Sequence, residues 1–283
     1  MLFKDLKEAA KDPILGLSEE FNNDSNPNKV NLAVGVYQDD NGKTSTFESV
    51  LEAEKILLDM DLSKSYKPID GDKEFLKKSI EMIFGEKILE EKKTFPIGLN
   101  TPGGTGALKL VSEFLNEFSS KSTVWFSNPT WANHKPIFES SGFETKGYQY
   151  FDVDNNNIDF ENMISSIKSI PSGDIIVLHG CCHNPTGCDL NVDQWKEIAN
   201  VLKQNNIITI CDFAYQGLAD GVEEDALGVR ILSEILDDIF ICSSYSKNFG
   251  LYSERVGCLF YSTKDKNKCE KILSQLKKTA RTI

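Results

Sequence analysis

Short, almost continuously hydrophobic runs alternate with amphipathic runs from about the middle of the chain to its end. Five hydrophobic runs are predicted to be β-strands, at residues 122–126, 174–180, 206–215, 238–246 and 256–262. Strands that are hydrophobic at nearly every position are buried on both faces, as in a parallel sheet that helices cover on each side. The pattern therefore predicts an α/β fold.

The amphipathic runs predict the helices of this fold. Residues 192–204 place five apolar side chains at helical spacing: Val192, Trp195, Ile198, Ala199 and Leu202. Residues 107–118 predict a second helix, entered through the sequence TPGGTG, and residues 155–159 a polar loop. Residues 264–283 predict a last helix, which reaches Ile283 without a glycine or proline end signal. We therefore expect that the chain is cut within or just after this helix.

The N-terminal 45 residues have a different pattern. Residues 19–29 are rich in Asn, Asp and Pro and predict a loop, and residues 30–44 form a short apolar segment followed by a turn. We expect residues 1–45 to wrap over the main body and residues 46–283 to form the main domain.

Composition and charge narrow the class of protein. The 283 residues carry a net charge of −12, which repels phosphate backbones and disfavours nucleic-acid binding. No apolar run approaches the roughly 20 residues that cross a bilayer. The charged N-terminal residues 1–13 do not form a secretory signal, so we expect a cytoplasmic protein without membrane contact.

The seven cysteines have no regular spacing and do not predict a disulfide framework. The sequence CCHNPTGC raises a metal site as an alternative. On an extended segment Cys181 and Cys182 point to opposite faces, so they are not expected to share one ion. We expect reduced, partly buried thiols and no metal.

Polar residues follow three of the predicted strands. Ligands of parallel α/β sheets bind beyond the carboxyl ends of the strands. The residues that this rule selects are His183, Asn184, Pro185, Thr186, Gly187, Asp212, Tyr215, Ser243, Ser244, Ser246 and Lys247. We expect them to converge on one crevice.

Lys247 and Arg255 suggest a specific chemistry for this crevice. An exposed lysine has a pKa of about 10.4, but desolvation and a neighbouring Arg255 would lower the pKa of Lys247. A neutral amine can form a Schiff base with an aldehyde, and arginine can hold a phosphate through two hydrogen bonds. An aldehyde and a phosphate in one small molecule describe pyridoxal 5′-phosphate (PLP). Taken alone, Lys247 is better explained as a solvated lysine.

The other candidates each have an ordinary structural alternative. Residues 103–106, GGTG, either simply begin a helix or cradle a phosphate at its N-terminus. Asp212 either caps a turn or holds a protonated heteroatom. Tyr215 and Trp131 are residue types that usually pack in a core, and His134 could be a buried histidine with satisfied hydrogen bonds.

Together the motifs resemble one family over essentially the whole chain. SYSKNFGLYSERVG, HNPTG, DFAYQG and GGTGALK occur in the order seen in the aspartate aminotransferases, which are fold-type I PLP enzymes. DPILGLSEEF, VNLAVGVYQDDNGK, YKPIDGDKEF and NPTWANHKPIF also look like their counterparts there. The resemblance implies a large domain built on a mainly parallel seven-stranded sheet with helices on both faces.

The resemblance also implies roles for the residues of the crevice. Lys247 would form the Schiff base and then carry the proton between the substrate and the cofactor. Asp212 would pair with the pyridine nitrogen of PLP and keep it protonated. Tyr215 and Asn184 would hydrogen-bond the ring oxygen, and Trp131 would stack on the ring.

Further positions are assigned to the phosphate by the same resemblance. Gly104 and Thr105 would donate to it from the helix N-terminus, with Ser244 and Arg255 completing the site. Gly103 stands in this phosphate loop where the family usually has a serine, so one contact is expected to be lost.

Three residues outside the crevice also receive roles. His134 would orient Asp212 from behind, and Gly35 would lie over the substrate carboxylate, for which Trp131 and Asn184 are also candidates. Tyr66 would reach the phosphate bound by the partner subunit, which implies a homodimer with shared sites.

The implied reaction is the transfer of an amino group from L-aspartate to 2-oxoglutarate, giving oxaloacetate and L-glutamate. The family's small C-terminal domain, which carries two substrate-binding arginines, is expected to be absent from this chain. The three arginines present are Arg230, Arg255 and Arg281, and the first and last stand where the family does not use them for substrate. Two alternatives stay open: a truncated, non-catalytic relative that binds PLP or dimerises, and an aromatic-amino-acid transaminase.

Overall fold

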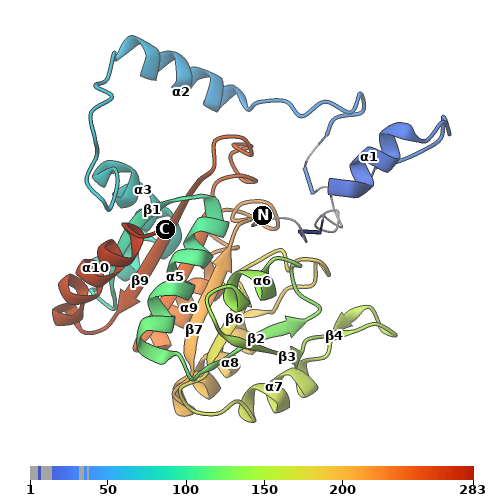
Figure 1. Cartoon of the computed structure of the whole chain (residues 1–283). Coiled ribbons are helices and arrows are strands. Elements are labelled where there is room, and N and C mark those ends of the chain that lie inside the picture. The colour runs from blue at the N-terminus through green and yellow to red at the C-terminus, as the bar shows by residue number, and fades with distance from the viewer. Residues whose placement is uncertain (1–5, 8–14, 32–34, 37) are drawn as a thin grey trace. The chain divides into compact units, whose positions relative to one another are not determined.

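The computed structural model describes residues 6–7, 15–31, 35–36 and 38–283. These residues fall into two compact units, 1–46 and 47–283, and each unit is considered by itself. The first unit contains the helix α1 (Leu15–Asn23). The second unit contains the sheet and the helices that cover it (Figure 1).

A seven-stranded sheet forms the centre of the second unit. Its strands lie in the order β1-β9-β8-β7-β6-β2-β3. Their bounds are β1 (Phe95–Pro102), β2 (Thr123–Asn128), β3 (Glu144–Gln149), β6 (Ile175–His179), β7 (Ile208–Phe213), β8 (Asp238–Ser244) and β9 (Val256–Thr263). Only β9 runs antiparallel to its neighbours, β1 and β8. The mainly parallel sheet expected from the resemblance is therefore confirmed.

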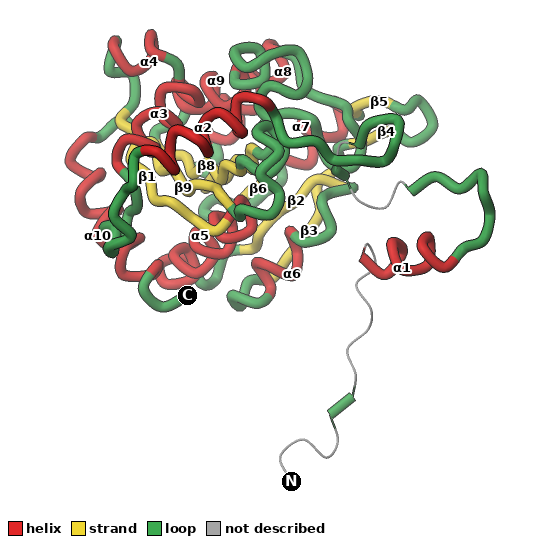
Figure 2. The backbone as a smooth tube through the Cα atoms, turned by 90° about the horizontal axis from the view of Figure 1, so that it is seen from above, coloured by secondary structure: helices red, strands yellow, loops and turns green. Residues whose placement is uncertain are grey.

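Helices cover both faces of the sheet, as Figure 2 shows. One face carries α3 (Lys73–Phe84), α7 (Phe160–Lys168), α8 (Val192–Gln204) and α9 (Leu227–Ile235), and the other carries α5 (Gly103–Ser119), α6 (His134–Glu139) and α10 (Lys266–Ala280). Successive residues of a strand point to opposite faces. Ile176 of β6 accordingly packs in the first layer, and Val177 in the second.

The hydrophobic runs and the long amphipathic runs of the sequence correspond to observed elements. All five predicted strands are present, and α8 has the predicted bounds because Asn191 and Gln194 form a capping box at its start. Helix α5 begins already at Gly103.

Two sheet strands were not predicted. β1 contains Pro96 and Gly98, which disfavour a strand prediction, and β3 lies at the sheet edge with mostly exposed or half-buried positions. The predicted loop at residues 155–159 is also partly wrong, because β5 (Asn157–Ile158) pairs there with β4 (Phe151–Asp152).

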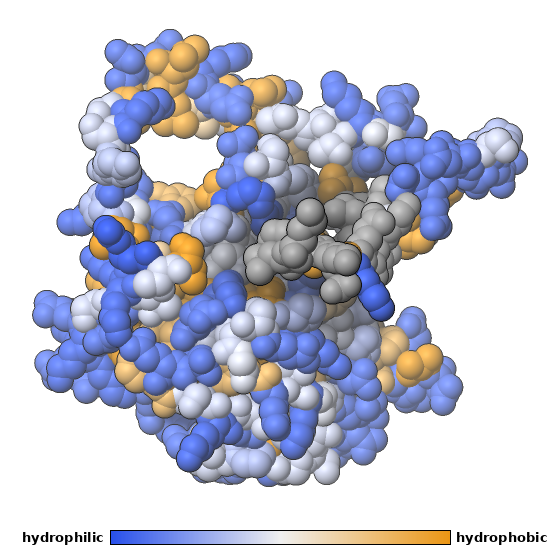
Figure 3. Space-filling model, viewed as in Figure 1, coloured by the Kyte–Doolittle hydropathy of each residue, from blue (hydrophilic) through white to orange (hydrophobic). Residues whose placement is uncertain are grey.

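Helix α2 (Glu48–Asp59) stands apart from the sheet layers, at the top of Figure 1. Its hydrophobic residues gather on the surface, as Figure 3 shows. The exposed ones in and just after the helix are Leu51, Ile56, Leu57, Leu58 and Met60. A short helix, α4 (Glu86–Glu90), follows α3. No helix in the described part of the chain is both long enough and apolar enough to span a membrane.

Candidate active site

The predicted crevice lies at the edge of the sheet where the parallel strands end. His179 at the end of β6 pairs with Asp212 of β7, and Phe213 pairs with Ser243 of β8. Because β9 runs the other way, its first residue lies at this same edge, and Arg255 immediately precedes it. The topology therefore brings residues that follow β6, β7 and β8 beside one that precedes β9.

Lys247 lies in the turn that follows β8 and is half-buried. Its Nζ is 5.2 Å from the centroid of the Tyr215 ring, and the described residues offer it no hydrogen-bond or ion-pair partner. Burial lowers the pKa of Lys247, Asp212 opposes that shift, and the charge of Arg255 lowers it further. The amine is thus disposed to lose its proton more readily than an ordinary lysine.

Asp212, on β7, points its carboxylate toward His134 at the start of α6. Nε2 of His134 lies 3.0 Å from Oδ2 of Asp212, and Nδ1 of the same ring lies 2.8 Å from Oγ1 of Thr130. The Asp212 side chain is only 12% exposed and that of His134 is fully buried. The predicted pairing of His134 with Asp212 is therefore present in the structure.

The chain has three histidines, and all three lie together behind Asp212. The Thr130 hydroxyl also lies 3.2 Å from Nε2 of His179, whose ring is 4.3 Å from that of His183. Burial lowers the pKa of His179 well below its usual value and that of His183 to about 4, with the nearby His134 adding to both shifts. His179 and His183 are thus neutral at pH 7. His179 was missed in the sequence, although its place at the end of a hydrophobic run was a signal for it.

The N-terminus of α5 forms the opposite end of the crevice. The residue before this helix is Pro102, whose side chain makes no capping hydrogen bond. The first backbone N–H groups of a helix attract anions. Gly104 is buried against Ser244, and a Cβ added to it would come 3.0 Å from the Cβ of Ser244. The helix start therefore needs glycine to lie this close to the end of β8.

Arg255 closes this end of the crevice. Its Nη1 donates to Oγ of Ser246 at 3.4 Å, and its guanidinium lies against Gly103. Gly103 has a φ of 72°, and a Cβ there would come 2.9 Å from Nη2 of Arg255. Position 103 therefore favours glycine for two reasons: the backbone has a positive φ, and there is no space for a Cβ.

Asn184 and Tyr215 meet between the two ends. The Asn184 amide donates to the Tyr215 hydroxyl at 3.5 Å. Burial raises the pKa of the Tyr215 phenol, and the charge of Asp212 raises it further. Trp131 is half-buried, and its ring meets that of His134 edge-on at 5.3 Å.

Two further predicted residues belong to other parts of the chain. Tyr66 is fully exposed, on the segment between α2 and α3. Gly35 belongs to the first unit and is exposed there. Their predicted roles, and those of Thr105 and Ser244 toward a phosphate, stay predictions.

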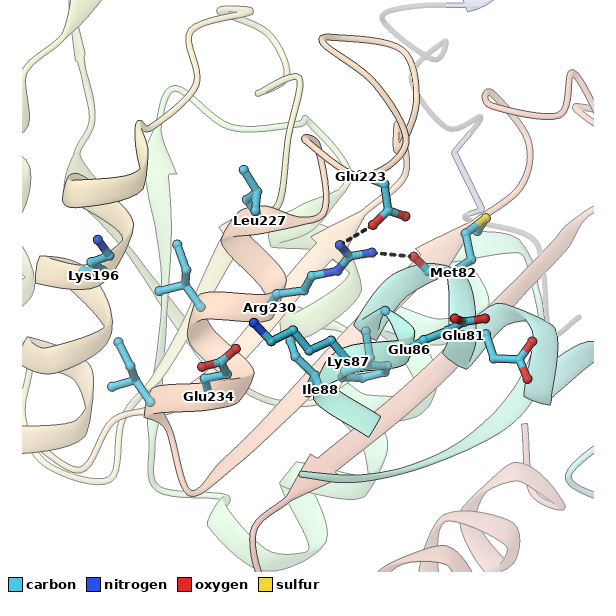
Figure 4. Close-up of a pocket in the computed structure, with 14 residues that line it drawn as sticks. Glu81, Met82, Glu86, Lys87, Ile88, Lys196, Glu223, Leu227, Arg230 and Glu234 are labelled. Atoms are coloured by element: carbon cyan, nitrogen blue, oxygen red, sulfur yellow. Dashed lines mark hydrogen bonds and ion pairs between the residues drawn. The ribbon is translucent and has the colours of Figure 1, made fainter. Parts of the chain in front are cut away.

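The remaining arginines are placed away from the crevice. Figure 4 shows Arg230 of α9 reaching across a pocket to the end of α3. Its Nε donates to the Ile83 carbonyl at 3.0 Å and its Nη2 to the Met82 carbonyl at 3.2 Å, while Nη1 forms an ion pair with Glu223 at 2.7 Å. Arg281 follows α10 and is exposed. Arg230 therefore joins two helices.

The expectation that Cys181 and Cys182 point to opposite faces is wrong. Cys182 has a φ of 48°, so the segment is not extended there. The two sulfur atoms and a carboxylate oxygen of Asp225 lie within 4.8 Å of one another. All seven cysteines are free thiols, as expected.

The crevice combines three chemical abilities. The α5 N-terminus and Arg255 can hold an anion, Asp212 can hold a protonated nitrogen, and Lys247 can act as a nucleophile or move a proton. These groups come from separate elements that meet only in the folded chain.

Comparison with known proteins identifies relatives over the whole chain. The sequence model of the family "Aminotransferase class I and II" matches residues 27–283. The aspartate aminotransferase of Escherichia coli K12 is 42% identical over 99% of this chain and 71% of its own length. The aromatic-amino-acid aminotransferase of Pseudomonas aeruginosa is 40% identical over 96% of this chain and 68% of its own length.

Solved structures give the same result for the fold. An aromatic-amino-acid aminotransferase from Burkholderia pseudomallei, covalently bound to pyridoxal phosphate, superposes with a TM-score of 0.94 at 40% identity. The match covers all of this chain and 71% of that one.

Proposed function

This chain belongs to the class I and II aminotransferases, and from that premise we propose that it transfers the amino group of L-aspartate to 2-oxoglutarate. The products are oxaloacetate and L-glutamate. The enzyme is a transaminase and its cofactor is PLP. The choice of aspartate is supported by the 42% identical relative, which is an aspartate aminotransferase.

The residues present fit this cofactor at both of its ends. The uncapped start of α5, Gly104 packed on Ser244, and the Arg255 guanidinium suit a phosphate. At the other end, Asp212 is oriented by His134 and suits a protonated ring nitrogen. Between them lies the Lys247 amine, with no hydrogen-bond or ion-pair partner among the described residues.

When bound, PLP supplies an electron sink for the pair of electrons left when the substrate loses its Cα proton. The protein supplies the positions and the proton transfers. Asp212 would hold the protonated ring nitrogen of the cofactor, and Lys247 would accept the proton that leaves Cα of the substrate and act as its carrier. Tyr215 and Asn184 would donate hydrogen bonds to the ring oxygen. The substrate amino acid binds and the first oxo acid leaves before the second substrate enters, which gives ping-pong kinetics.

The single observation that carries the PLP chemistry is the half-buried Lys247 amine, set between Asp212 and Arg255 with a lowered pKa. Its test is borohydride reduction of the PLP-bound protein, followed by peptide mass spectrometry. The pyridoxyl group is expected on the peptide that contains Lys247 and absent from Lys247→Ala. A label on another lysine contradicts the assignment.

The substrate is tested separately. Aspartate and 2-oxoglutarate are compared with tyrosine and phenylalanine in the first half-reaction, by the change in the PLP absorption band. We expect a higher kcat/KM for aspartate. A preference for the aromatic amino acids favours the second candidate, an aromatic-amino-acid transaminase, which the 40% identical relatives support.

We also propose a homodimer with shared active sites. Tyr66 is fully exposed, and the neighbouring α2 presents Leu57 and Leu58 to solvent, which is unusual for a surface without a partner. Light scattering should give twice the chain mass, and Leu58→Glu should weaken that association. Tyr66→Phe should lower PLP retention modestly, because one hydrogen bond is removed. A monomer that retains PLP tightly rules out shared sites.

A further inference from the structure

A second group of ligand-type side chains lies between the segment after β6 and the loop before α9. The sulfur atoms of Cys181 and Cys182 and a carboxylate oxygen of Asp225 lie within 4.8 Å of one another. Cys181 and Asp225 are buried, while Cys182 is partly exposed. Within the described ranges no other set of three or more His, Cys, Asp or Glu side chains is placed in this way. The group is distinct from the PLP residues.

The backbone holds the two sulfur atoms on one side. Cys182 adopts a φ of 48°, which turns the chain between the two thiols. The Asp189 carboxylate accepts the N–H of Cys182 at 2.6 Å and that of His183 at 2.8 Å. The turn is therefore fixed by hydrogen bonds without any contribution from the thiols themselves.

The carboxylate of the group is also held in place. Asp225 accepts backbone N–H bonds from Gly217, Ala219, Asp220 and Gly221 at 2.8, 3.0, 2.9 and 3.4 Å. No Lys, Arg or His of the described residues forms an ion pair with it. Among these residues the charge of Asp225 is therefore compensated by backbone N–H groups alone, which also fix the position of both carboxylate oxygens.

Solvent reaches the group from one side. Cys182 is partly exposed, whereas Cys181 and Asp225 are buried. The thiolate is the form of cysteine that binds metals, so a cation that enters at Cys182 displaces the thiol protons.

We propose that Cys181, Cys182 and Asp225 bind a thiophilic divalent cation of the Zn²⁺ class. Two sulfur ligands select against Mg²⁺ and Ca²⁺, which prefer oxygen. Three protein ligands leave one position for water, as in open zinc sites. Ligand atoms around such an ion are about 3.8 Å apart when the metal–sulfur distance is ~2.3 Å, so a small movement from 4.8 Å forms the site.

The position of this ion has a structural consequence. Asn184 lies two residues after Cys182, and Tyr215 lies two residues before Gly217, whose N–H binds Asp225. The cation would therefore join the segment that carries Asn184 to the loop that follows Tyr215. This role does not depend on which amino acid is the substrate.

The test uses Cd²⁺ as a spectroscopic probe on the full chain with PLP bound, because thiolate-to-cadmium charge transfer absorbs in the ultraviolet. We expect one equivalent of Cd²⁺ to produce this absorption, Zn²⁺ to displace it and Mg²⁺ to leave it unchanged. No absorption with Cd²⁺, or absorption that Zn²⁺ does not displace, overturns the proposal.

Substitutions of single residues test which side chains bind the ion. Cys182→Ser and Asp225→Asn should each weaken Zn²⁺ binding by roughly 10- to 100-fold or more, because removal of even an outer-shell partner costs that much. Cys188→Ser is the matched control, since Cys188 is a partly exposed thiol nearby that lies outside the group. Circular dichroism verifies that each variant is folded. Unchanged Zn²⁺ affinity in a folded Cys182→Ser protein contradicts the proposal.

Alkylation of the unsubstituted protein gives a second measurement in case the variants do not fold. Zn²⁺ should protect Cys181 and Cys182 from alkylation, as read from peptide masses, and leave Cys188 reactive. Equal alkylation of Cys182 with and without Zn²⁺ also overturns the proposal.

Discussion

Nε2 of His134 lies 3.0 Å from Oδ2 of Asp212, and Thr130 holds the far side of the same imidazole. The carboxylate is thus aimed by a buried ring from α6, a helix that lies on one face of the sheet, while Asp212 itself belongs to β7. Because the orientation is set by protein groups, it is in place before any cofactor binds.

The first prediction distinguishes the catalytic role of Asp212 from the positioning role of His134. Asp212→Ala should lower the rate of the aspartate half-reaction by several orders of magnitude, since the ring nitrogen loses the group that keeps it protonated and each ~1.36 kcal/mol is tenfold in rate. His134→Ala should cost about tenfold, because the carboxylate stays but loses one hydrogen bond. Stopped-flow absorption of the PLP band measures both. Equal effects of the two substitutions would show that Asp212 does not act directly.

The second prediction concerns the pH dependence of Lys247. Its pKa in the folded protein is lowered by burial and by Arg255 and raised by Asp212. Asp212→Asn should therefore shift the reactivity of the Lys247 amine, measured by reductive methylation of the PLP-free protein, toward lower pH. Arg255→Gln should shift it toward higher pH. Shifts in the opposite directions contradict the placement of the two charges.

The same lowered pKa has a consequence for stability. Between the folded-state pKa and the unfolded value of 10.5, the unfolded chain binds the proton that the folded chain has lost. The Lys247 contribution to the free energy of unfolding therefore rises with pH in that window and is least favourable below it. Lys247→Met should raise the Tm of the PLP-free protein at pH 7. A Tm that falls by several degrees would mean that the ammonium is well paired.

The third prediction concerns Gly103, which stands where the aspartate aminotransferases usually have serine. Gly103→Ser should weaken PLP binding, although serine could add a phosphate contact. A left-handed conformation costs a non-glycine residue about 1–2 kcal/mol, and the added Cβ would come 2.9 Å from Nη2 of Arg255. Equilibrium dialysis gives the Kd for PLP. Tighter binding would show that Arg255 moves aside at little cost.

The fourth prediction tests whether Arg230 serves structure or substrate. Arg230→Gln should destabilise the protein by about 2 kcal/mol, because hydrogen bonds of a charged group to Met82 and Ile83 are lost. The KM for aspartate should not change. Arg281→Gln is the control, because Arg281 is exposed and should alter the Tm little. A raised KM with an unchanged Tm would identify Arg230 as a substrate ligand.

The hydrophobic pattern was sufficient to predict the strands that carry the crevice. β6, β7 and β8 are buried and hydrophobic, and the rule on carboxyl ends then selected Asp212, Asn184 and Lys247. The pattern failed at β3, because an edge strand buries little and can be polar, and at β1, which includes proline and glycine.

Side-chain geometry was harder to predict than the elements. The approach of Cys181 to Cys182 depends on a single positive φ at a residue that is not glycine, and the sequence carries no signal for that. His179 was missed because its partner, Thr130, follows a different strand. A Cβ at position 103 would clash with the Arg255 guanidinium. The position of that guanidinium depends on the whole fold, so the sequence could not reveal the need for glycine.

The antiparallel direction of β9 also limits the distance between two ligand-binding side chains. Lys247 and Arg255 lie in one short connection between paired strands, and the Tyr245 N–H to Val256 carbonyl bond, at 3.0 Å, closes its base. The span between the amine and the guanidinium is therefore limited by this one loop. A molecule that engages both groups must match that span, so one residue added or removed between Asn248 and Glu254 would change the length of ligand that the crevice accepts while leaving the sheet intact.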